Sequence, residues 1–122
     1  MKTILVVAFV LFAFSVSAYE HITFNQLPIR SQKLAVCENN RFDPALRILD
    51  TNSKYSTGIL MYQRGTFISF GRDSGILPRN LTNREIDLLI KNPWIQSAIT
   101  EWALDNGLAS HWFFCSKRAG FI

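Results

Sequence analysis

Two stretches of the sequence decide the fold: CENNRFDPA at residues 37–45 and STGILMYQRGTF at residues 56–67. The first stretch places Glu38 at the end of an apolar, helix-like run. Asn39 and Asn40 end this run, and Asp43 and Pro44 mark a turn after it. The second contains a short, strand-like run around Gly58, and a threonine follows that is able to cap a helix. The order helix, turn, strand, helix predicts a mainly α protein, of the α+β class, with a small β region.

The expected helices are short, and each begins at a residue type that caps helices and ends near Asn or Gly. The expected caps are Ser31, Thr66, Thr82 and Asn92. Thr82 and Glu85 form a capping box, in which each side chain satisfies a backbone donor at the start of the helix. Together these elements predict a helical body with a cleft along the β region.

Residues 1–18 have the features of a secretory signal peptide. Lys2 supplies a positive charge, residues 4–14 are apolar but short for a membrane span, and small residues precede the expected cleavage after Ala18. Residues 19–122 remain, which is enough for one domain and too few for two. We therefore expect a secreted or periplasmic protein with no stable membrane insertion after cleavage.

Both cysteines, Cys37 and Cys115, follow the expected cleavage site. An exported chain with two cysteines favours one disulfide, and two free thiols are the alternative. Two cysteines and two separate histidines, His21 and His111, lack the spacing of a metal site. No metal and no cofactor are expected.

The chain carries a formal net charge of +4 at pH 7, and of +3 without Lys2. A mildly basic exported protein suits an anionic polymer such as bacterial cell wall. Nucleic acid is another polyanion, but the basic residues are dispersed and no nucleic-acid-binding motif is present, so no nucleic-acid partner is expected.

The motifs resemble those of the lytic transglycosylase branch of the lysozyme-like superfamily, in particular its small secreted bacterial and phage members. That family typically has a Glu-Ser-x-Phe-x-Pro-x-Ala stretch, then Ser/Ala-x-Gly-Leu-x-Gln, then a helix that begins with threonine. Its small members end in an Asn-Pro-x-x-Gln helix and a Trp near a Cys. The resemblance covers about residues 33–116 and includes, in order, residues 37–46, 56–58, 64–67 and 92–96, and Trp112 with Cys115.

The resemblance implies a lysozyme-like fold whose cleft binds the glycan strands of peptidoglycan, and a monomer that needs no cofactor. It gives Glu38 the position of a single glutamate that acts first as acid and then as base. In that family an internal hydroxyl of muramic acid attacks and leaves an anhydro-sugar; a muramidase reaction with water is the other outcome for such a site. The residues expected to contact the substrate are Asn39, Ser56, Gly58, Tyr62, Gln63 and Trp112.

An acid that cleaves glycosides must hold its proton near neutral pH, whereas an ordinary glutamate has a pKa of about 4.3. From the apolar residues before Glu38 we expect the base of its side chain to lie against the core, which would raise its pKa; a solvated surface glutamate is the alternative. Asp43 and Asp50 are the candidates for a second carboxylate. Asp43 suits a turn and Asp50 lies in a polar loop, so neither is assigned a catalytic role.

Two positions depart from the family pattern. Asn39 follows Glu38 where the family usually has Ser, and Met61 stands where it usually has Gln. Gln63 lies two residues further on, and therefore on the same face of a strand as Met61. The alternative function is a catalytically degenerate lysozyme-like module that binds cell-wall glycan or an envelope protein.

Overall fold

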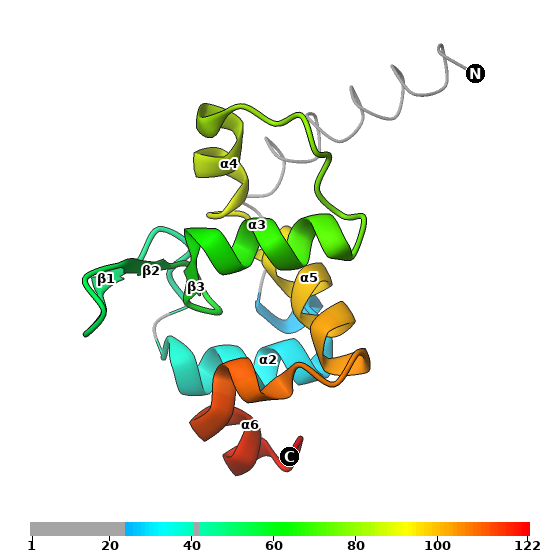
Figure 1. Ribbon diagram of the computed structural model, residues 1–122. Coiled ribbons are helices and arrows are strands. Elements are labelled where there is room, and N and C mark those ends of the chain that lie inside the picture. Colours follow the sequence, from blue (N-terminus) through cyan, green and yellow to red (C-terminus); the bar gives the residue numbers. More distant parts are fainter. Residues whose placement is uncertain (1–23, 41) are drawn as a thin grey trace.

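Helices dominate the structure, and a small antiparallel sheet lies at one edge of them (Figure 1). The computed structural model describes residues 24–40 and 42–122, and the predicted signal peptide at residues 1–18 lies outside them. Within the described part, every helix is too short or too polar to be a candidate for a membrane span. The mixed α+β character expected from the sequence is confirmed. The helices are α2 (Ile29–Glu38), α3 (Arg64–Asp73), α4 (Asn83–Leu89), α5 (Pro93–Asp105) and α6 (Phe113–Ala119), with 3₁₀ turns η2 (Phe24–Gln26) and η3 (Ala109–Trp112); the strands are β1 (Arg47–Leu49), β2 (Tyr55–Thr57) and β3 (Tyr62–Gln63).

Two helices begin at the caps that the sequence predicts. Thr82 precedes α4 in a capping box: its hydroxyl accepts from the Glu85 N–H at 3.2 Å, and the Glu85 carboxylate accepts from the Thr82 N–H at 3.1 Å. Asn92 precedes α5 and accepts from the Ile95 N–H at 3.0 Å, with Pro93 in the first turn. Both caps satisfy donors that the helix itself leaves free.

Two other expected caps are wrong. Helix α2 begins directly after Pro28, so Ser31 lies inside the helix, where its buried hydroxyl donates to the carboxylate of Glu101 in α5 at 2.7 Å. Helix α3 begins at Arg64, directly after β3, so Thr66 lies within its first turn. The Ser31 hydroxyl thus binds a neighbouring helix instead of its own helix start, and β3 leads straight into α3.

The strand-like run predicted around Gly58 consists of two strands joined by a tight turn. Strand β2 pairs with β1 on one side and β3 on the other. Positive φ angles at Gly58 (87°) and Met61 (51°) allow the turn between β2 and β3. In the register, Ile48 pairs with Ser56 and Ser56 pairs with Gln63. These three side chains therefore share one face of the sheet.

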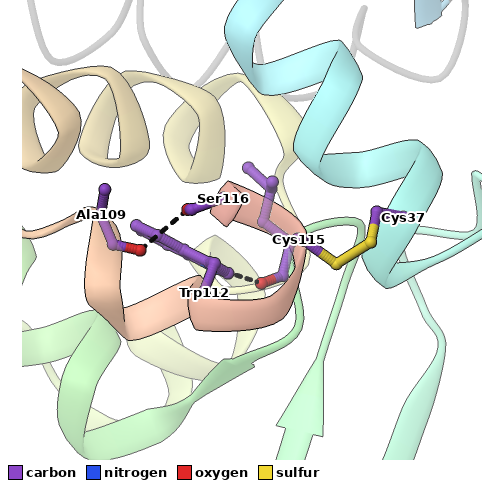
Figure 2. Close-up of a disulfide and its surroundings, with 6 residues drawn as sticks. Cys37, Ala109, Trp112, Cys115 and Ser116 are labelled. Carbon is purple, nitrogen blue, oxygen red and sulfur yellow. Dashed lines mark hydrogen bonds between the residues drawn. A yellow bond between two sulfur atoms is a disulfide. The ribbon is translucent and has the colours of Figure 1, made fainter. Parts of the chain in front are cut away.

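A disulfide joins α2 to α6 and confirms the bridge expected from the two cysteines (Figure 2). The Cα atoms of Cys37 and Cys115 are 5.7 Å apart, and 78 positions separate them in the chain. A link that closes so long a loop stabilises a fold by about 4 kcal/mol in the loop-entropy account. Near the bridge, the indole N–H of Trp112 donates to the Leu60 carbonyl at 3.0 Å, which connects η3 to the turn between β2 and β3.

The buried side-chain amide of Gln96 joins α5 to the same turn. Its Nε2 donates to the carbonyls of Thr57 at 2.8 Å and Ile90 at 2.5 Å, and its Oε1 accepts from the Leu60 N–H at 2.9 Å. Gly58 packs directly on this amide, because a Cβ at that position would lie 2.4 Å from Nε2. Gln96 therefore fixes the turn against the helical body.

We predict that Gln96→Leu lowers the free energy of unfolding by about 2 kcal/mol or more, because at least the buried Leu60 N–H loses its partner. Gln32→Leu is the matched control. The Gln32 amide donates to the Leu27 carbonyl at 2.7 Å but is only partly buried, so water replaces it and the change should stay below about 1 kcal/mol. Urea unfolding measures both variants, and equal stabilities would contradict the role given to Gln96.

Candidate active site

A pocket of about 600 Å³ lies between the end of α2, the sheet and η3. Glu38, the last residue of α2, is part of its lining. The row of side chains on one face of the sheet contributes Ile48, Ser56 and Gln63. Four of the residues predicted for the cleft thus line one pocket, namely Glu38, Ser56, Gln63 and Trp112. Their roles toward a substrate stay predictions. The full lining is Glu38, Ile48, Asp50, Ser56, Met61, Gln63, Thr66, His111 and Trp112.

The carboxyl group of Glu38 is partly buried. Burial raises its pKa above the ordinary value, and the negative charge of Asp50 raises it further. Glu38 therefore keeps its proton to a higher pH than an exposed glutamate does. Such a group is suited to donate a proton to a bound ligand.

Asp50 lies in the same pocket, and its surroundings favour the opposite protonation state. Its Oδ2 accepts hydrogen bonds from the Ser56 hydroxyl and, at 2.9 Å, from the Gln63 side-chain amide. The bond from Ser56 first, and that from Gln63 second, lower the pKa of Asp50. The sequence names Asp50 only as a candidate second carboxylate in a polar loop, and the structure adds that these two strand residues hold its carboxylate at the pocket.

His111 and Trp112 form the η3 side of the pocket. The His111 ring stacks on the ring of Tyr62, with centroids 5.8 Å apart, and desolvation lowers the pKa of His111. A neutral imidazole adds no positive charge that would lower the pKa of Glu38. Trp112 is only 3% exposed, so it forms part of the wall and offers no free ring face to a sugar.

Three residues predicted for the cleft do not line the pocket. Neighbouring side chains in a strand point to opposite faces, and Gln63 points to the pocket. Tyr62 therefore points into the core, where it is fully buried and its hydroxyl is hydrogen-bonded to that of Thr100 at 2.8 Å. Gly58 and Asn39 are also buried. The Asn39 amide donates to the Gly58 carbonyl at 3.1 Å, so both belong to the support of the turn. These three residues lie outside the lining of this pocket, and their contact with a substrate stays a prediction.

Glu38 also borders a second space, a groove of about 910 Å³ between α2 and α6. Lys33 of α2 and Arg118 of α6 line this groove and place positive charge on that side of Glu38. Glu38 therefore takes part in the lining of both spaces.

Comparison with known proteins gives no match. No family model, curated protein or solved structure matches the chain. Within residues 24–40 and 42–122, no group of three or more His, Cys, Asp or Glu side chains is placed to hold a metal ion. The pocket does contain two carboxyl groups with different surroundings, together with a hydroxyl and a side-chain amide.

We predict that Ser56→Ala destabilises the protein at neutral pH more than in acid. The folded-state pKa of Asp50 is depressed, so its bond to Ser56 stabilises the fold above the unfolded pKa of about 3.9, and this contribution is lost as the pH falls through the folded pKa. We expect a loss of about 1 kcal/mol at neutral pH, since the carboxylate is partly exposed to water.

Ser69→Ala, on the exposed side of α3, is the control for this experiment and should change stability by less than about 0.5 kcal/mol. Urea unfolding at neutral and at acidic pH measures the difference between the two variants. An equal loss at both pH values for Ser56→Ala would contradict a bond that depends on the charge of Asp50.

Proposed function

We propose that the protein is a secreted or periplasmic enzyme that cleaves the glycan strands of peptidoglycan, as a lytic transglycosylase or muramidase. Glu38 is the general acid and then the general base. The observation that carries the proposal is a partly buried carboxyl group, with a raised pKa, in a pocket of about 600 Å³. A lysozyme-like fold is part of the proposal, and a helical body with a small sheet beside this glutamate supports it.

Cleavage of a glycosidic bond requires a proton on the leaving oxygen as the bond breaks. Glu38 supplies this proton because burial keeps its carboxyl group protonated to higher pH. After the bond has broken, the carboxylate of Glu38 takes a proton from the hydroxyl group that attacks the sugar. One residue thus serves both steps, and its protonation state is restored at the end.

The surroundings of Glu38 suit a sugar polymer. On the sheet side of the pocket, the oxygens of the Ser56 hydroxyl and the Gln63 amide can still accept hydrogen bonds from sugar hydroxyls, while their N–H and O–H donors bind Asp50 and Asn52. The groove on the other side of Glu38 carries Lys33 and Arg118, whose charges complement the carboxylates of peptidoglycan. A chain of several sugars can therefore contact the protein on both sides of the bond that is cleaved.

A glycan-binding module without catalytic activity is the second candidate function. Met61 favours it, because its apolar side chain lines the pocket, whereas the lytic transglycosylases that the motifs resemble usually have glutamine at this position of the motif. A module of this kind would bind peptidoglycan through the same pocket and leave the glycan strands intact.

We predict that Glu38→Gln reduces the rate of peptidoglycan cleavage by about 100-fold or more, because the amide is unable to donate or accept the proton. Stability at neutral pH should stay the same or rise slightly, since the variant removes a carboxyl group whose charged form is disfavoured by burial. The release of soluble fragments from purified peptidoglycan, together with thermal unfolding, measures both effects.

Glu85→Gln is the matched control, because Gln also suits the capping box and Glu85 lies outside the pocket lining. It should cleave at the wild-type rate. Cleavage by Glu38→Gln at that same rate would contradict the proposed role of Glu38. A wild-type protein that binds peptidoglycan without releasing fragments would favour the binding module.

A further inference from the structure

A second carboxylate, that of Asp50, lines the pocket that contains Glu38. We propose that Asp50 is a second catalytic residue, which stays ionised and faces the positive charge that develops on the sugar, and that water is the acceptor. This inference rests on the proposed function and extends it, because it selects hydrolysis over the internal attack that leaves an anhydro-sugar.

The sheet holds Asp50 in a defined orientation. The Ser56 hydroxyl and the Gln63 amide both donate to Oδ2, and within the described part of the chain no hydrogen bond reaches Oδ1. Asn52 supports the arrangement, since its Oδ1 accepts from Gln63 Nε2 at 3.1 Å and its Nδ2 donates to Gln63 Oε1 at 3.1 Å. The sheet thus holds one carboxylate oxygen, and the other has no hydrogen-bond partner among the described residues.

The reaction that follows from this arrangement has two steps. In the first, Glu38 donates its proton to the glycosidic oxygen, the bond from that oxygen to the anomeric carbon breaks, and the electron pair stays on the leaving oxygen. The positive charge on the anomeric carbon and ring oxygen is stabilised by the carboxylate of Asp50. In the second, water forms a bond to the anomeric carbon and gives a proton to Glu38. One water is consumed, both carboxyl groups return to their starting states, and nothing is oxidised or reduced.

The different surroundings of the two carboxyl groups support this division of roles. The side chain of Glu38 is partly buried, and its carboxyl group accepts no hydrogen bond from the described residues. The carboxyl group of Asp50 accepts two. The same difference moves the pKa of Glu38 up and that of Asp50 down. Two carboxyl groups separated in this way serve as an acid and as a charged partner at one pH.

The test compares Asp50→Asn with Asp43→Asn in the mature protein. Asparagine keeps the size of Asp50 and an oxygen that accepts hydrogen bonds, so the fold should persist, and thermal unfolding checks this. Asp43 is the matched control because its carboxylate caps a turn, accepting from the Ala45 N–H at 3.0 Å, and does not line the pocket. Purified peptidoglycan is the substrate, and mass spectrometry identifies the sugar ends of the fragments.

We expect the wild type to release fragments with reducing ends, Asp50→Asn to do so about 100-fold or more slowly, and Asp43→Asn to match the wild type. The pH at which activity falls on the alkaline side should also move lower in Asp50→Asn, because a charge that raises the pKa of Glu38 is removed. The other titratable or charged groups around Glu38, namely Lys33, His111 and Arg118, are unchanged in this variant.

Fragments with anhydro ends would overturn this inference and leave the proposed function in place. Wild-type rates in Asp50→Asn would overturn it in the same way. The absence of any fragment from the wild type would overturn the proposed function, and this inference with it.

Discussion

The hydrogen bonds of the Gln96 amide hold the turn between β2 and β3 on α5, and the sheet side of the pocket depends on where this turn lies. Two further side chains bind the same turn. Asn39, at the end of α2, donates to the Gly58 carbonyl, and Trp112, at the end of η3, donates to the Leu60 carbonyl. The three parts of the chain that form the pocket are thus connected through one buried turn. Loss of that turn would move the sheet away from Glu38.

The features of the fold that depend on neighbouring residues could be predicted from the sequence. The caps Thr82 and Asn92 are examples, because a capping side chain binds backbone only three residues away. The expected cap at Ser31 is wrong because its hydroxyl binds a helix that is 70 positions further along the chain. Gly58 was predicted to contact the substrate, and in the structure its backbone packs closely on the side chain of Gln96, which lies 38 positions further along the chain.

The same distinction explains what could be predicted of the site. Glu38 and Gln63 follow from the order of short motifs, and both line the pocket. Tyr62 is next to Gln63, and successive side chains of a strand point to opposite faces. The two side chains therefore cannot both point into the pocket. The position of Asp50 at the pocket could not be predicted, because Ser56 and Gln63 come 6 and 13 positions later and only the pairing of the strands places them at its carboxylate.

One pocket contains both Glu38, whose carboxyl group keeps its proton to higher pH, and Asp50, whose carboxyl group loses its proton at lower pH. Carbon-13 NMR of the side-chain carboxyl groups of Glu38 and Asp50, followed over a pH titration, tests this directly. We expect the pKa of Glu38 to lie above the ordinary glutamate value of about 4.3 and that of Asp50 below the ordinary aspartate value of about 3.9. A Glu38 carboxyl group with a pKa at or below its ordinary value would contradict its role as the proton donor.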